Sequence, residues 1–248
     1  GAIVLERDLG SAIVLSAIGL WLLVLGGARK RGIAFAVGIL LALGFLAIRM
    51  EAYRSSRLHS FRDPFSDPLN TGFQPIHAMF ALGTGGFRGV GLGNSVEKYL
   101  WLPEAHSDFI FAIIGEELGL LGTLGVIGAF SFLLWRGVRT ALRAPDRFGT
   151  LLAGGITAWI GIQAFINMAA VTNVSPTTGI TLPFISFGGT SLVSTLLAVG
   201  VLCNISAQGR RHQGEARRAH VDRWRGDGGT HHPRDRAGDG AALDGPVG

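Results

Sequence analysis

Three polar side chains near the middle of the chain have the types and spacing to do chemistry. Glu104, His106 and Asp108 alternate in a short segment that leads directly into a long apolar stretch. A carboxylate at such a boundary can act as the general base for a hydroxyl nucleophile. Asp108 could equally be the N-cap of a helix, and the Glu-x-His-x-Asp pattern could also hold a divalent metal ion. The residue types alone leave all three alternatives open.

Four further polar residues lie inside apolar stretches. Glu116 and Glu117 follow Asp108 by roughly 12 Å at helical rise, a depth at which charged groups normally face the interior of a helix bundle. Both a structural clamp and a place in a reaction pocket remain open for them. Gln163 and Asn167 are one helical turn apart on one face, where hydrogen bonding between helices is the ordinary function and a place in a pocket is the alternative.

A glycine-rich segment precedes these carboxylates. Its spacing, Gly89-x-Gly91-x-Gly93, is shared with phosphate-binding loops, in which backbone N–H groups approach an anion. No strand is expected before the segment and no clear helix after it, which argues against a nucleotide site and favours a flexible loop at the membrane surface. A lipid pyrophosphate is a third alternative, because Arg88 and Lys98 flank the segment.

Composition places these residues in a membrane protein. The 248 residues are 48% hydrophobic and 16% charged, whereas soluble domains carry about one quarter charged residues. Five apolar segments have about the length needed to cross a bilayer. They cover residues 9–27, 33–48, 109–135, 148–172 and 187–206. The sequence predicts an all-α, polytopic helical membrane protein. It excludes a compact soluble enzyme or a nucleic-acid binder, despite the net charge of +5.

Basic residues predict how the spans are oriented. They gather at three junctions that share a side if the spans alternate, and the positive-inside rule makes that side the cytoplasm. These junctions are residues 28–32, 136–147 and 210–211. Residues 49–108 then form a long outer loop with a surface helix near 73–82. The uncharged Pro/Gly loop at 173–186 is expected to be buried and to wall a pocket. We expect a transmembrane domain over residues 1–208 and a disordered basic tail over 209–248.

Two long motifs resemble the SEDS (FtsW/RodA/SpoVE) family of bacterial cell-wall glycosyltransferases. One combines Gly89–Ser95 with Leu102–Gly119, and the other is Ser175–Gly189. The resemblance covers residues 5–206 and is closest to the members that act in cell division. It departs from the usual pattern at Arg7, where the family has Pro, and at Phe187, where it has Tyr. The family has roughly ten spans, so the resemblance implies a C-terminal half with further sequence upstream.

The resemblance implies polymerisation of lipid II on the outer face of the bacterial cytoplasmic membrane, at the division septum. Asp108 is then the general base, and a divalent cation such as Mg²⁺ or Mn²⁺ could assist the leaving pyrophosphate. The expected substrate contacts are Arg88, Lys98, Glu104, His106, Ser175 and Ser186. The expected partners are a class B penicillin-binding protein transpeptidase, divisome proteins and membrane lipids. The alternatives are a lipid II flippase and an inactive half-length division scaffold.

Overall fold

The computed structural model describes residues 9–50, 60–100, 102 and 106–227, and within these residues it is helical with no strand. The elements are α2 (Leu9–Leu25), α3 (Lys30–Met50), η1 (Pro64–Ser66), α5 (Phe73–Gly85), α6 (Glu97–Leu100), α7 (Ile110–Leu142), α8 (Arg147–Val171) and α9 (Gly189–Asp227). Helices α7, α8 and α9 are long and apolar enough to cross a membrane, and Gly10–Leu25 is a shorter apolar helix. The predicted all-α, polytopic membrane architecture is confirmed, and so is the helix expected near residues 73–82.

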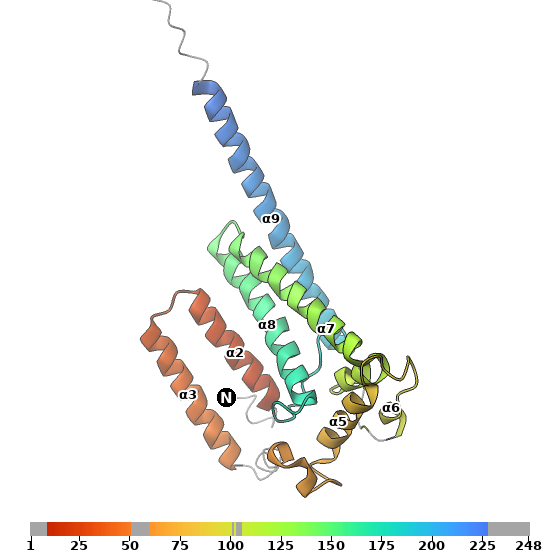
Figure 1. Ribbon diagram of the computed structural model, residues 1–248. Coiled ribbons are helices and arrows are strands. Elements are labelled where there is room, and N and C mark those ends of the chain that lie inside the picture. Colours follow the sequence, from red (N-terminus) through yellow and green to blue (C-terminus); the bar gives the residue numbers. More distant parts are fainter. Residues whose placement is uncertain (1–8, 51–59, 101, 103–105, 228–248) are drawn as a thin grey trace, which may run out of the picture.

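Helix α8 lies between α2 and α7 and forms the centre of the bundle (Figure 1). Small residues let the helices approach, as is usual for helices in lipid. Gly154 and Gly155 of α8 face leucines of α2, and Gly161 faces Leu134 of α7. On the same helix Ile160 is fully buried. Large apolar side chains elsewhere point outward, which suits a surface that contacts lipid tails or further protein.

Helix α7 is broken at Gly119, although the sequence predicted one continuous span there. Gly119 has φ 66° and ψ −159°, a conformation that only glycine adopts readily. A Cβ atom at this position would lie 2.4 Å from the backbone nitrogen of Gly89. The break therefore exists because the glycine-rich segment lies directly against the α7 backbone.

The glycine-rich segment fills this break with its own backbone. The N–H of Val90 donates to the carbonyl of Glu116 at 2.9 Å, and the N–H of Gly91 donates to the carbonyl of Glu117 at 3.0 Å. A Cβ atom on Gly89 would lie 2.1 Å from the Glu117 carbonyl oxygen. Two of the N–H groups that could have faced an anion are thus bonded to α7. Most of the segment is exposed, as a surface loop would be, but its backbone packs closely against α7, and this packing requires the glycines.

The three basic junctions lie at one end of the bundle (Figure 1). The guanidinium of Arg147, at the start of α8, donates to the carbonyl of Gly26, which follows α2, at 2.7 Å. Helix α9 leaves the bundle at this same end (Figure 1). The predicted common side of the junctions is confirmed, and the assignment of that side to the cytoplasm stays a prediction.

Helix α9 differs from the sequence prediction beyond Gly209. The sequence predicted a disordered tail from residue 209, but α9 continues as a helix to Asp227. The described side chains of residues 210–224 are all exposed. A helix that is already nucleated propagates easily through residues of good helix propensity, and residues 210–227 contain no proline. Residues 228–248 lie outside the described part of the chain.

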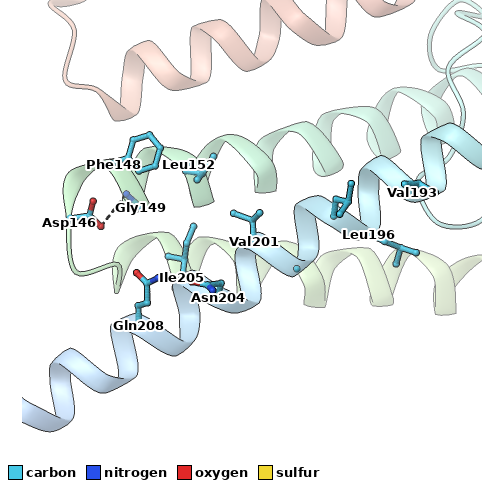
Figure 2. A pocket seen from close by; sticks show the side chains of 12 residues that line it. Asp146, Phe148, Gly149, Leu152, Val193, Leu196, Val201, Asn204, Ile205 and Gln208 are labelled. Carbon is cyan, nitrogen blue, oxygen red and sulfur yellow. Dashed lines mark hydrogen bonds between the residues drawn. The ribbon is translucent and has the colours of Figure 1, made fainter.

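An apolar groove of about 860 Å³ runs between α8 and α9 (Figure 2). Val193, Leu196 and Val201 of α9 line it opposite Leu152 of α8. At the basic end of the groove, the carboxylate of Asp146 caps α8 by accepting the N–H of Gly149 (Figure 2). The groove leaves α9 packed against the other helices along only part of its surface.

Candidate functional site

Asp108 lies in a turn immediately before α7. Residues 106–108 form this turn, Phe109 is the N-cap residue, and the helix begins at Ile110. Phe109, and not Asp108, occupies the N-cap position, so the alternative of Asp108 as the N-cap residue is wrong. The side chain of Phe109 is buried and anchors the turn, whereas Asp108 is half-buried. The carboxylate is therefore held at the protein surface by its neighbour.

The Asp108 carboxylate lines a cavity of about 80 Å³. The cavity is walled by α5, the turn before α7, the last turns of α8 and the loop after α8. Its lining residues are Gln74, Asp108, Phe109, Asn167, Ala170, Val171, Thr177, Thr178, Gly179 and Ile180. The predicted meeting of the long loop with the uncharged Pro/Gly loop around a pocket is confirmed.

Asn167 of α8 holds the two loops of this cavity together. Its side chain is 2% exposed, and its Nδ2 donates to the carbonyl oxygens of Asp108 at 2.8 Å and of Ile180 at 2.6 Å. One turn earlier, Gln163 Nε2 donates to the carbonyl of Thr181 at 3.1 Å. Both amides therefore bond to loop carbonyls and not to another helix, and Asn167 has the place in a pocket that the sequence left open beside helix packing. In an irregular loop, backbone carbonyl groups have no partners from regular secondary structure. The side-chain amides of Asn167 and Gln163 donate hydrogen bonds to three of them.

Two buried oxygens in the cavity wall lack hydrogen-bond partners within the described residues. They are Oδ1 of Asn167 and Oγ1 of Thr178. Buried polar atoms are nearly always paired with protein or water, so each such atom needs an explanation. Both atoms belong to residues that line the cavity together with Asp108, so polar groups of three residues lie in its wall. The arrangement suits a hydroxyl group or a water molecule that donates protons into it.

Ser186 and His106 position the Asp108 turn from outside the cavity. The Ser186 hydroxyl accepts the N–H of Leu182 at 2.7 Å and donates to the carbonyl of Ser107. The N–H of Phe187 donates to the carbonyl of His106 at 2.9 Å, and the two rings meet edge to face. These contacts fasten the Pro/Gly loop to the residues that precede Asp108.

The two glutamates of α7 hold the segment that follows the glycines. The Glu116 carboxylate is 2% exposed; it accepts the Ser95 hydroxyl and the N–H of Val96, the latter at 2.9 Å. Glu117 Oε1 lies 3.9 Å from Nζ of Lys98. Glu116 is thus a structural clamp, one of the two alternatives that the sequence left open. Neither glutamate lines the Asp108 cavity.

Of the predicted site residues, the structure brings Asp108 and Asn167 to the cavity. Arg88 and Lys98 lie instead near the break in α7, which is roughly 16 Å from Asp108 along the helix at 1.5 Å per residue. Ser175 is held by α8 through its backbone N–H, which donates to the Ala169 carbonyl at 3.1 Å. Glu104 lies outside the described residues. The substrate-contact role of these residues stays a prediction.

Sequence reasoning missed Gln74, Thr177 and Thr178 as cavity residues. The two threonines stand inside the Ser175–Gly189 motif, in which the predicted substrate contacts are Ser175 and Ser186. Gln74 lies in the predicted surface helix and gave no signal of its own. Among the described residues, no group of three or more His, Cys, Asp or Glu side chains gathers as a metal site would require.

The sequence of this chain matches a known family over most of its length. A model of the FtsW/RodA/SpoVE family, described as a cell cycle protein, matches residues 1–211. The chain belongs to this family. It is 46% identical over 203 residues to a probable peptidoglycan glycosyltransferase FtsW of Geobacter metallireducens, covering 82% of this chain and 54% of that protein.

Two further relatives support this membership. The chain is 46% identical over 209 residues to stage V sporulation protein E of Bacillus subtilis, covering 84% of this chain and 57% of that protein. It also resembles a solved component of a peptidoglycan synthase complex, studied for the structural coordination of polymerization and crosslinking. That match has a TM-score of 0.66 and 27% identity, and covers 84% of this chain and 58% of that one. The chain spans about half the length of the curated relatives it matches.

Proposed function

We propose that this chain is the half of a peptidoglycan glycosyltransferase that carries the catalytic base, and that the enzyme polymerises lipid II during cell division. The observation that carries this proposal is the Asp108 carboxylate in a small polar cavity, where Asn167 Oδ1 and Thr178 Oγ1 lack partners among the described residues. The names of the FtsW relatives support the reaction class.

In this proposal Asp108 acts as the general base. The 4-hydroxyl of the acceptor glycan attacks the anomeric carbon of the donor, and its proton passes to the Asp108 carboxylate. The new glycosidic C–O bond forms as the bond between that carbon and the pyrophosphate oxygen breaks, and undecaprenyl pyrophosphate leaves. A hydroxyl is a poor nucleophile until a positioned base accepts its proton, which contributes on the order of 10²–10⁴-fold to the rate.

The cavity suits the acceptor hydroxyl better than a whole sugar. Its volume of about 80 Å³ admits a hydroxyl-bearing group or a few water molecules. The single hydroxyl proton of that group is directed at the Asp108 carboxylate. The Thr178 hydroxyl can donate to the oxygen of the same group, and Asn167 Oδ1 can accept from a neighbouring hydroxyl or water. The donor and its lipid then approach from outside the cavity. Arg88 is exposed near the break in α7 and remains the candidate cation for the departing pyrophosphate.

The described residues do not form a resident site for a divalent cation. Asp108 is the single carboxylate in the cavity lining. Magnesium is commonly held by one or two carboxylates together with substrate phosphates, rather than by a cage made of protein groups. In this proposal the groups of this chain carry out the proton transfer.

The proposed setting is the bacterial cytoplasmic membrane at the division septum, with the Asp108 end of the bundle outside. The basic junctions at the opposite end support this orientation. A class B penicillin-binding protein is the proposed partner, because the solved relative is part of a complex that coordinates polymerization and crosslinking. Other divisome proteins are proposed to join this assembly.

The test is Asp108→Asn in a complete family protein that contains this half, purified with its transpeptidase partner. Polymerisation of lipid II should fall by on the order of 10²–10⁴-fold while expression and partner binding persist. Asp146→Asn is the matched control. It changes another Asp at a helix start, where Asn is a comparable cap, and it should leave polymerisation unchanged.

Two outcomes would count against the proposal. Glycan chains formed at the normal rate by Asp108→Asn would remove Asp108 from the catalytic role. If the parent protein moves lipid II across the bilayer but does not polymerise it, the flippase alternative is favoured.

A further inference from the structure

Two polar stripes face each other where α7 and α9 reach the basic end of the bundle. Together they line a cleft of about 50 Å³, distant from the Asp108 cavity. The α7 residues are Arg136, Arg139, Thr140 and Arg143, and the α9 residues are Ser206, Gly209, Arg210 and Gln213. On each helix these positions recur every three to four residues, so they share one face. The cleft is therefore formed by side chains from both helices.

Gly209 sets how closely the two helices approach. A Cβ atom on Gly209 would lie 2.5 Å from the carbonyl oxygen of Arg143, so the helices touch here through backbone. Gly209 is buried at the floor of the cleft, whereas the arginines around it are exposed. The small residue thus brings positive side chains from two helices together.

Four guanidinium groups surround this cleft, and within the described residues no ion pair joins any of them to a carboxylate. Arg139 lies over the ring of Trp135, with its guanidinium carbon 5.1 Å from the ring centroid. Like charges on neighbouring helical positions destabilise a fold unless an anion compensates them. The positive-inside rule explains the side on which these arginines lie, but it does not require them to line one cleft.

Helix lengths place the cleft at the level of lipid headgroups. Arg139 is 20 residues beyond the break at Gly119, and Gly209 is 20 residues beyond the first residue of α9. At 1.5 Å per residue, each distance is about 30 Å, the thickness of the hydrocarbon core. Trp135 beside the cleft suits the same level, because tryptophan is enriched at membrane interfaces.

We propose that this cleft binds the phosphate of an anionic phospholipid in the leaflet at the basic end of the bundle. Guanidinium groups pair with phosphate through two parallel hydrogen bonds, which lysine cannot do. Clusters of basic residues next to a transmembrane helix attract anionic lipids, and each cation near the surface contributes about fivefold in affinity. The cleft is too small for an acyl chain, so the headgroup alone enters it.

The test compares lipid retention by two double variants of the whole chain. The chain is purified in detergent, supplied with equal amounts of phosphatidylglycerol and phosphatidylcholine, and analysed by native mass spectrometry. Arg139→Gln/Arg210→Gln should bind phosphatidylglycerol roughly 25-fold more weakly than the parent chain. Arg29→Gln/Arg31→Gln removes two charges from the same end of the bundle, away from the cleft, and should bind as the parent does.

Conservative variants and a soluble anion complete the test. Arg139→Lys/Arg210→Lys keeps both charges and should show an intermediate loss, because lysine lacks the forked geometry. Equal losses in the two glutamine pairs would show general surface attraction and overturn the proposal. Inorganic phosphate that displaces phosphatidylglycerol at equal concentration would also overturn it, because the site would then select a free anion. Thermal unfolding of each variant establishes that it is folded.

Discussion

Replacing Thr178 with valine removes a buried hydroxyl oxygen and keeps the branched shape of the side chain. The Thr178 oxygen has no hydrogen-bond partner within the described residues and lines the Asp108 cavity. The substitution therefore breaks no described protein hydrogen bond. An unsatisfied buried polar group costs about 1–3 kcal/mol, and water in the cavity recovers part of this cost. We expect the free energy of unfolding to stay within about 1 kcal/mol of the parent value or to rise.

Polymerisation should respond in the opposite direction. If the Thr178 hydroxyl donates a hydrogen bond to the oxygen of the reacting hydroxyl, its loss removes about 0.5–1.5 kcal/mol, which is roughly 2- to 13-fold in kcat/KM. Lipid II polymerisation is measured in the complete protein, and unfolding is followed by a thermal melt in the same detergent.

Thr172→Val is the matched control for this substitution. The Thr172 hydroxyl donates to the Met168 carbonyl at 2.8 Å, within the last turn of α8, and does not line the cavity. This variant should polymerise lipid II at the parent rate. Unchanged kcat/KM in Thr178→Val, in a protein that Asp108→Asn inactivates, would refute the assignment of Thr178 to the acceptor group. A fall of more than about 2 kcal/mol in unfolding free energy would instead reveal a structural hydrogen bond at Thr178.

Two other predictions test the fold and its orientation. Gly119→Ala should lower the free energy of unfolding by about 2 kcal/mol or more, because the backbone conformation of Gly119 is strained for alanine and the new Cβ would meet Gly89. The control Gly125→Ala adds a Cβ in open space and should leave the free energy of unfolding unchanged or raise it. Equal effects of the two substitutions would contradict the packing argument. In a Cys203→Ser background, Ser66→Cys should react with a membrane-impermeant thiol reagent in intact spheroplasts. Glu215→Cys should not react, because the basic end of the bundle is expected to be cytoplasmic. The reverse labelling pattern would show that the orientation is inverted.

The sequence determined the membrane class and the approximate helix positions. Apolar segments without charge cross a bilayer whatever their neighbours are, so composition along the chain is enough to find them. The predicted segments 148–172 and 187–206 correspond to α8, at Arg147–Val171, and to the first half of α9. The sequence also singled out Asp108, because a carboxylate at the edge of an apolar stretch stands out chemically and because its surroundings resemble a known family.

The tertiary structure alone decided which residues share a site with Asp108. Glu116 and Glu117 are nearer to it in sequence than Asn167 and Thr178 are, but their side chains hold the segment that follows the glycines. Asn167 reaches Asp108 because α8 runs back along α7 and the loop after α8 folds over the turn. The break at Gly119 could not be predicted from the sequence either, because a glycine in an apolar segment is compatible with a regular helix and with a break. The packing of the glycine-rich segment against α7 decides between the two. Local composition sets where a chain can cross a membrane, whereas contacts between segments far apart in sequence set which side chains meet.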